Sequence, residues 1–169
     1  VAKVISKNKI KLSFDKDLSK PNLENYKLNE LSNHNKKPMP RGWYDFFSIK
    51  IRYTDINLSQ KYLPTKPLSQ KLFNIILETR SIVIGFKEFI GCKKNIEEIF
   101  KEIKEEIFRG SSNNEQIFFE FFLKKLQKRT TNSSTFFRKF PRINDDHIKL
   151  LINLINNEEL YYKQARIIA

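Results

Sequence analysis

From residue 41 onward the pattern of hydrophobic and polar positions is helical. From there one stripe of positions recurs at spacings of three and four, as on one face of a helix, and it consists of Trp43, Phe46, Phe47, Lys50 and Ile51. The segment Tyr62-Leu63-Pro64 interrupts this pattern. Pro67 then suits the first position of a second helix, because its missing N–H would be unpaired there in any case.

The second helical pattern contains two glycines that predict different features. Its apolar positions lie mainly on one face, and they are Leu68, Leu72, Ile75, Ile76, Val83, Phe86 and Ile90. Gly85 lies inside the pattern, where a missing side chain predicts the close approach of another helix or a kink. Gly91 follows the last apolar position and is predicted to end the helix.

Residues 96–107 form a third, strongly amphipathic pattern, with isoleucines on one face and a mixture of glutamate and lysine on the other. Asn95 precedes it and is predicted to be its N-cap. Farther along, the composition predicts a loop at 110–113, a buried helix at 117–126, a loop at 130–135, a break at Pro141, and a last helix that runs to Tyr161 with Asn144 or Asp145 as its cap.

The first forty residues follow a different pattern. Ile10, Leu12 and Phe14 alternate with polar residues, which predicts a half-exposed strand, and Lys7-Asn8 suits a turn to a preceding short strand. Residues 15–40 are polar and contain three prolines, as in an irregular connection. The sequence therefore predicts a mainly α fold of about five helices at 41–169, with a short strand or hairpin and its connection at 1–40.

The bulk composition favours one soluble domain. The chain has 169 residues, of which 40% are hydrophobic and 30% are charged. No apolar run is long enough to span a membrane, and the N-terminus lacks a signal-peptide pattern, so we expect a cytoplasmic location. The single cysteine excludes an internal disulfide. The first residue is Val1, which indicates a fragment, an alternative start codon or a processed chain.

The net charge of +13 raises the question of nucleic-acid binding. Most of the excess is lysine, which accompanies abundant asparagine and isoleucine, so an A/T-rich genome would also produce it. Lysines occur along the whole chain and are mixed with glutamates, which weighs against a binding footprint. We therefore expect a solvated basic surface and no nucleic-acid partner. Lysines gathered on one face, with affinity that falls steeply as salt rises, would favour the opposite interpretation.

The residue patterns of the sequence predict no catalytic, cofactor or metal site in this chain. The four glycines do not form a phosphate-binding loop. Cys92 lies beside Lys93 and Lys94, which would lower its pKa, but a small buried residue at a helix junction is the preferred interpretation. The triplet Asp145-Asp146-His147 resembles metal ligands, but acidic residues at a helix start explain it better.

A polar stripe of alternating charge begins at the same point as the first helix. It consists of Arg41, Asp45, Ser48, Arg52 and Asp55 at spacings of four, three, four and three. One interpretation is a solvent-exposed ladder of ion pairs, each contributing less than about 1 kcal/mol. The other is a network that the next helix partly covers, paired with Glu78 and Arg80. The sequence leaves both open.

Three motifs follow one another between residues 41 and 96. The first, Arg41-Gly42-Trp43-Tyr44-Asp45 followed by Ile49 to Asp55, is similar to RG.AD..AL.LR.HD. The second runs from Leu63-Pro64 through Leu72-Phe73 and Glu78-Thr79-Arg80 to Gly85, and is similar to AP…A..IFD..E.AR.EA.G. The third, Gly91 to Ile96, is similar to M.GV..NL. In order and spacing they resemble the N-terminal helical region of the CobT-type subunit of aerobic, ATP-dependent cobaltochelatase.

This resemblance implies structural or partner-docking roles for Arg41, Gly42, Asp45, Arg52, Asp55, Glu78, Arg80, Gly85, Gly91 and Asn95. The chain departs from the family pattern at Thr54, where the family has histidine, and at Ile82, where it has glutamate. Tyr44, Phe47 and Ser48 replace family alanines. These departures fit a divergent homologue or the decay of an unselected copy.

The family inserts Co²⁺ into a corrin ring, with a large catalytic subunit, an AAA+ ATPase and CobT. The resemblance implies an accessory role in cobalamin biosynthesis, in which this chain docks onto the ATPase and partner subunits or another domain handle cobalt and ATP. The serine-rich metal motif of the family's von Willebrand A domain does not occur in these residues. A non-functional remnant of a split gene is a third alternative, beside a basic nucleic-acid-binding protein.

Overall fold

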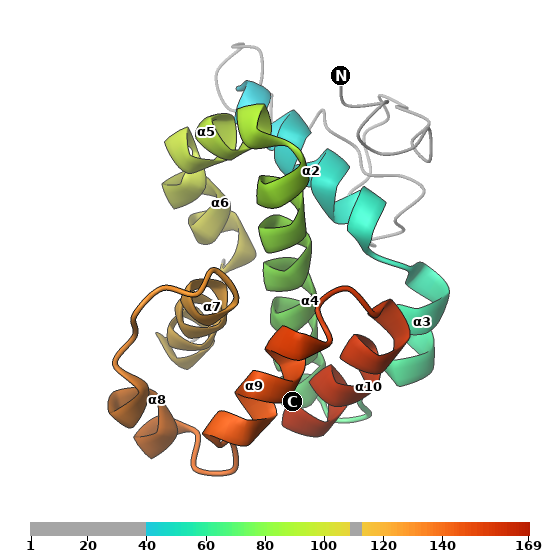
Figure 1. The fold of residues 1–169 in the computed structure, drawn as a ribbon, viewed down its shortest axis with the longest axis vertical. Coiled ribbons are helices and arrows are strands. Elements are labelled where there is room, and N and C mark those ends of the chain that lie inside the picture. The colour runs from blue at the N-terminus through green and yellow to red at the C-terminus, as the bar shows by residue number, and fades with distance from the viewer. Residues whose placement is uncertain (1–39, 109–112) are drawn as a thin grey trace.

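The computed structural model describes residues 40–108 and 113–169, and within these ranges the fold is helical without strands (Figure 1). The helices are α2 (Arg41–Tyr53), α3 (Ile56–Tyr62), α4 (Pro67–Glu88), α5 (Ile90–Glu98), α6 (Phe100–Ile107), α7 (Asn113–Leu126), α8 (Ser133–Lys139), α9 (Asp145–Asn153) and α10 (Glu158–Ile168). The prediction of a mainly α fold is confirmed. The predicted N-terminal strand and most of its connection lie outside the described residues.

Helix α4 is the central element of the fold. It packs against α2, α5, α7 and α10, and Figure 1 shows it running through the middle of the molecule. Phe73 and Ile76 are completely buried. Neighbours on several sides explain why α4 is apolar over most of its surface from Leu72 to Ile84.

Several helix starts agree with the sequence prediction. Pro67 is the first residue of α4, and the side chain of Asn144 caps α9 by accepting a hydrogen bond from the backbone N–H of His147 at 2.9 Å. Gly85 lies at a close helix crossing, because a Cβ atom there would come within 2.5 Å of the Ile49 side chain on α2. The predicted close approach at Gly85 is therefore confirmed.

The predictions for Gly91 and Asn95 are wrong. Helix α4 ends at Glu88, and both residues lie inside α5. The predicted helix over 96–107 is divided at Ile99, between α5 and α6. Local pattern did not reveal the place of Asn95 within α5, because its side chain makes a contact that is distant in sequence, the hydrogen bond to Asp45.

The C-terminal half contains more helices than predicted. The predicted loop over 130–135 includes the start of α8, which Asn132 caps through the backbone N–H of Thr135. The predicted last helix is two helices, because the chain breaks after α9 and Asn157 caps α10. In total the described residues hold nine helices, where about five were predicted.

Two residues of the second apolar pattern are exposed. Leu68 is 61% exposed and Ile90 is 79% exposed. Each lies in the first turn of its helix, Leu68 in α4 and Ile90 in α5, so neither has a neighbouring helix over its side chain. The apolar periodicity includes these two positions, but no neighbouring helix packs over their side chains.

Phenylalanine rings join α7 to α8. The rings of Phe121 and Phe136 stack with centroids 3.6 Å apart at an interplanar angle of 5°. Phe118 lies 4.6 Å from Phe122 and 5.2 Å from Phe140, again between ring centroids. The buried helix predicted from this phenylalanine density is confirmed, although it begins at Asn113.

Candidate functional site

Two polar clusters lie at the two ends of α2. The Asp45 cluster consists of Arg41, Asp45 and Asn95 and joins α2 to α5. The Arg80 cluster consists of Arg80, Tyr53, Asp55, Glu158 and Tyr162 and joins α4 and the end of α2 to α10. Between the clusters, α2 contacts its neighbours mainly through apolar side chains. Each cluster contains residues from the sequence motifs.

Arg80 is the centre of its cluster and is only 5% exposed. Its Nε atom donates to the carbonyl oxygen of Ile155 at 2.9 Å, and a terminal guanidinium nitrogen donates to the carbonyl of Tyr53 at 2.8 Å. The same nitrogen lies 3.2 Å from a carboxylate oxygen of Glu158. These partners come from the end of α2, the segment before α10, and α10 itself. One side chain therefore fixes three parts of the chain.

Glu158 extends the cluster to the start of α3. The carboxylate oxygen that faces Arg80 also accepts hydrogen bonds from the Tyr162 hydroxyl at 3.1 Å and from the backbone N–H of Asp55 at 3.2 Å. The Asp55 side chain in turn accepts a hydrogen bond from the N–H of Leu58, which caps α3. The turn between α2 and α3 is thus tied to α10.

Aromatic rings complete the surroundings of the guanidinium. Its central carbon lies 5.4 Å from the ring centroid of Tyr161 and 6.0 Å from that of Tyr162. Burial raises the pKa of both tyrosines above the ordinary value. Both hydroxyls therefore stay protonated, and Tyr162 can donate to Glu158 across the neutral pH range.

The Asp45 cluster is built on a close approach between α2 and α5. Asp45 is 1% exposed and accepts a hydrogen bond from the Asn95 amide at 2.6 Å, while the largely exposed Arg41 lies 3.7 Å away. A Cβ atom on Gly42 would come within 2.2 Å of the Asn95 carbonyl oxygen. Glycine at this position therefore allows the contact that satisfies Asp45.

Cys92 lies beside the Asp45 cluster and is buried. Burial, followed by the nearby Asp45 carboxylate, raises the pKa of its thiol to about 11. Lys93 and Lys94 do not produce the lowered pKa that a reactive thiol requires. The interpretation of Cys92 as a small buried residue at a helix junction is confirmed.

The rest of the predicted stripe is divided among different partners. Ser48 is buried and donates to the carbonyl of Tyr44 at 2.6 Å, and Glu78 forms an ion pair with Lys50. The Arg52 guanidinium lies 5.3 Å from the ring centroid of Phe89, and its Nε donates to the Tyr53 hydroxyl. The structure favours a network that other helices partly cover over a solvent-exposed ladder of ion pairs. In this network Glu78 pairs with Lys50, which was not the expected connection.

Tyr53 links this region to the end of α4. Its hydroxyl donates to Glu88 at 2.6 Å. Burial and the Glu88 carboxylate raise the pKa of Tyr53 to about 12.

The sequence did not indicate three side chains that take part in these contacts. One is Lys50, the partner of Glu78. The other two are Glu158 and Tyr162, the partners of Arg80 and Asp55. Glu158 lies 103 residues from Asp55, so no local spacing could indicate the contact. Gly91, which the motif comparison included, has open space around it and belongs to neither cluster.

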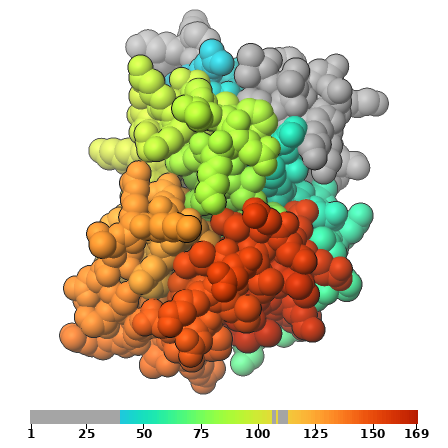
Figure 2. Space-filling view, in the orientation of Figure 1, coloured from blue at the N-terminus to red at the C-terminus, as the bar shows by residue number. Residues whose placement is uncertain are grey.

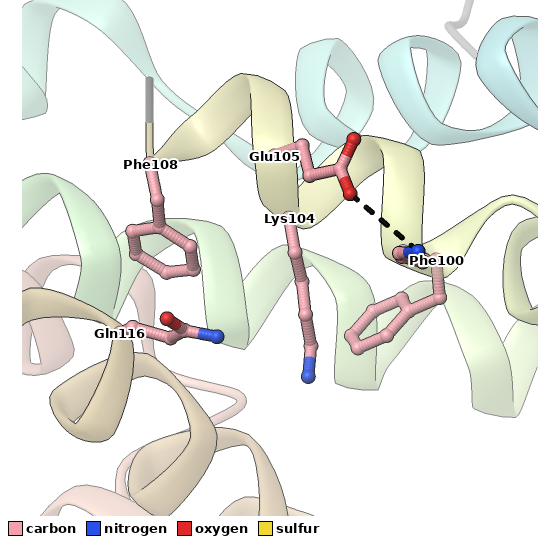
Figure 3. A pocket seen from close by; sticks show the side chains of 6 residues that line it. Phe100, Lys104, Glu105, Phe108 and Gln116 are labelled. Carbon is pink, nitrogen blue, oxygen red and sulfur yellow. Dashed lines mark ion pairs between the residues drawn. The ribbon is translucent and has the colours of Figure 1, made fainter. Parts of the chain in front are cut away.

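A surface pocket with a cavity volume of about 610 Å³ lies between α6 and α7 (Figure 3). It is lined by Phe100, Lys101, Lys104, Glu105, Phe108 and Gln116. The dashed line in Figure 3 marks the ion pair of Lys101 with Glu105, and Lys104 pairs with Glu120 at 2.7 Å. None of the motif residues lines this pocket.

The triplet Asp145-Asp146-His147 begins α9, and Asp146 pairs with Lys149 at 3.5 Å. This agrees with the helix-start interpretation. In the part of the chain that the structure describes, no three histidine, cysteine or acidic side chains are grouped so that they could hold a metal ion. Across the same residues, no helix combines the length and apolar character that a membrane span requires.

The fold and its clusters define a helical domain in which the motif side chains hold helices together. The family model described as cobalamin biosynthesis protein CobT matches residues 1–130. Because this match covers well over half of the chain, the chain belongs to the CobT family. Comparison with curated proteins and with solved structures found no match. The matched segment ends before α8, so Glu158 and Tyr162 complete the Arg80 cluster from beyond it.

Proposed function

We propose that this chain is an accessory, non-catalytic region of a cobaltochelatase that docks onto an AAA+ ATPase partner. Its membership in the CobT family supports a role in cobalamin biosynthesis. In this proposal the large catalytic subunit carries out cobalt insertion, and cobalt and ATP are handled by partner subunits or by another part of the protein. The chain contributes a rigid helical body to the assembly.

The observation that carries the proposal is the use of the motif side chains in contacts between helices. Arg80 and Asp45 are at most 5% exposed, and apart from Arg41 the groups that they bind belong to other helices or to the segments next to them. Such contacts fix α2, α4, α5 and α10 relative to one another. A surface that is ordered before binding loses less conformational entropy when a partner docks, which suits a scaffold.

The two main departures from the family pattern are compatible with this role. Thr54, in place of histidine, has its hydroxyl 3.3 Å from that of Ser81 on α4. Ile82, in place of glutamate, is 1% exposed and belongs to the hydrophobic core. Thr54 therefore connects the end of α2 to α4 and Ile82 adds to the core, so a stable scaffold does not require the family's histidine and glutamate at these positions.

The proposal is tested by adding the purified chain to its cognate AAA+ ATPase and measuring the rate of ATP hydrolysis. We expect a saturable change in rate and a complex on gel filtration. Lys163→Gln serves as a matched control, because Lys163 is exposed on α10 and lies outside the motif residues. If the wild-type chain forms no complex and leaves the rate unchanged, the docking function is wrong.

A further inference from the structure

The segment between Glu120 and Asp145 contains no acidic residue, although the rest of the described chain mixes both signs of charge. Its seven cations are Lys124, Lys125, Lys128, Arg129, Arg138, Lys139 and Arg142. We call these residues the α7–α8 basic face. All except Lys125 are exposed. Mixing of lysine and glutamate over the whole sequence concealed this local separation of charge.

Ring contacts show that the face is compact. Phe136 stacks on Phe121, and Phe140 contacts Phe118, one turn earlier on α7. Helix α8 therefore runs back along α7, which places Arg138 and Lys139 near Phe118 while Lys128 and Arg129 lie at the turn between the two helices. At 1.5 Å per residue the seven residues of α8 span roughly 10 Å, so the face extends about that far along α8 from the turn. Figure 2 shows the orange segment that contains α7 and α8 on the surface, beside the red C-terminal helices.

Two of the three flanking acidic residues have ion-pair partners outside the face. Glu120 pairs with Lys104 of α6 at 2.7 Å, Asp146 pairs with Lys149 at 3.5 Å, and Asp145 lies in the first turn of α9. Among residues 40–108 and 113–169, none of the seven cations has an ion-pair partner. Lys125 does contact the Phe121 ring, at 5.5 Å from its centroid. The positive charge of the face is therefore not neutralised by the described part of the fold.

Two further features point to phosphate groups. The cations flank the run Thr130-Thr131-Asn132-Ser133-Ser134-Thr135, and hydroxyl and amide side chains of this kind accompany Lys and Arg in contacts with nucleic-acid phosphates. A duplex carries about one negative charge per 1.7 Å of its axis, so several phosphates lie within reach of a patch of seven cations. Carboxylates on a protein surface rarely reach that density.

The aromatic residues of the segment argue for a duplex over a single strand. Single-stranded nucleic acid is bound through rings on which bases stack. Phe121 and Phe136 are 5% and 2% exposed, and the rings of Phe137 and Phe140 are partly buried. The segment thus offers charge and hydrogen-bond donors but no fully exposed ring.

We propose that the α7–α8 basic face binds the phosphate backbone of double-stranded nucleic acid without sequence preference. This activity is separate from docking on the ATPase, and Arg138, Lys139 and Arg142 lie beyond the residues that the family model matches.

The backbone at Lys128 provides a variant that separates binding from folding. Lys128 has a φ of 58°, and the N–H groups of Lys128 and Arg129 bond to the carbonyls of Lys125 and Lys124, as in a Schellman motif. Glycine is the residue best suited to this conformation. Lys128→Gly therefore removes a charge from the face and at the same time relieves strain in the fold.

The test is fluorescence anisotropy of a labelled 20-base-pair DNA duplex of arbitrary sequence, titrated with the full chain at several salt concentrations. We expect log affinity to fall linearly with log salt. A variant with Lys124→Gln, Arg129→Gln, Arg138→Gln and Lys139→Gln should lower the magnitude of this slope by about 3 to 4, at roughly 0.9 per lost phosphate contact. Lys128→Gly should lower it by about 1 while the melting temperature rises.

A matched control has the same change in net charge at exposed lysines elsewhere: Lys66→Gln, Lys87→Gln, Lys94→Gln and Lys163→Gln. It should keep the wild-type slope. Equal losses in both quadruple variants would overturn the proposal, because binding would then depend on total charge. A 20-residue polyglutamate peptide that displaces the duplex as well as unlabelled duplex would also overturn it, in favour of an acidic protein surface.

Discussion

The guanidinium of Arg80 lies 3.2 Å from the carboxylate of Glu158, although 78 residues separate them in the sequence. This contact joins the central helix to the last one. Because Arg80 is buried, Glu158 and the two backbone carbonyls that it binds offset the cost of removing its charge from water.

We expect Arg80→Ala to lower the free energy of unfolding by about 3 kcal/mol, since it removes the side-chain donor of the two carbonyls and the ion-pair partner of the carboxylate. Glu158→Gln should cost about 1 kcal/mol, because Glu158 is 34% exposed and glutamine retains an acceptor. Urea denaturation measures both values. Equal and small effects, below about 0.5 kcal/mol for each variant, would contradict the clamp that we describe.

Alanine substitutions at three glycines test the helix contacts. Gly42→Ala should destabilise most, because its Cβ would meet a backbone oxygen at 2.2 Å. Gly85→Ala should destabilise less, since its Cβ would meet the side chain of Ile49, which has some freedom to shift. Overpacking of this kind typically lowers the free energy of unfolding by about 1–3 kcal/mol.

Gly91→Ala is the control for this series. Gly91 lies in open space inside α5, so alanine should stabilise the protein by about 0.5–1 kcal/mol. Thermal melting of the three variants gives the order, and a Gly42→Ala protein as stable as Gly91→Ala would show that α2 and α5 do not approach as closely as described.

The features that the sequence predicted correctly are those that depend on residues close together in the chain. The start of α4 at Pro67 and the Asn144 cap follow from local chemistry, and Gly85 was identified by its place inside an apolar pattern. The partners of the clusters were not predictable in this way. Asn95 resembles an N-cap in sequence, yet its amide binds Asp45, because tertiary packing of α5 on α2 outweighs local capping preference.

Ionisation of the Cys92 thiol makes the stability of the fold depend on pH. Its pKa in the folded protein is about 11, above the ordinary value of 9.0. As pH rises above 9, the unfolded chain loses the thiol proton first, so the free energy of unfolding falls between pH 9 and pH 11. Below pH 9 the contribution is fully present.

Urea denaturation of the wild type and Cys92→Ala at pH 8 and pH 10 tests this dependence. The stability advantage of the wild type over the variant should shrink at the higher pH. Other titrating groups, including Tyr53, are common to both proteins and cancel in the difference. An advantage that is the same at both pH values would mean that Cys92 is not shielded from ionisation in the fold.

Lys128→Gly should raise the free energy of unfolding by up to about 1 kcal/mol, because glycine adopts a φ of 58° without steric conflict. In a chain of this size the melting temperature should increase by about 2–4 °C. Lys124→Gly is a suitable control, since Lys124 lies within α7 and glycine there should destabilise the helix. A decrease in melting temperature for Lys128→Gly would show that the backbone at Lys128, at the end of α7, is not strained.

The central claim is that the clustered motif residues maintain a rigid scaffold that docks onto an AAA+ ATPase. The most direct measurement is analytical ultracentrifugation of the chain mixed with its cognate ATPase, with wild type, Lys163→Gln and Arg80→Ala compared at equal concentration. We predict that wild type and Lys163→Gln sediment with the ATPase and that Arg80→Ala does so in proportion to its folded fraction. Sedimentation of the folded wild-type chain entirely apart from the ATPase would contradict the claim.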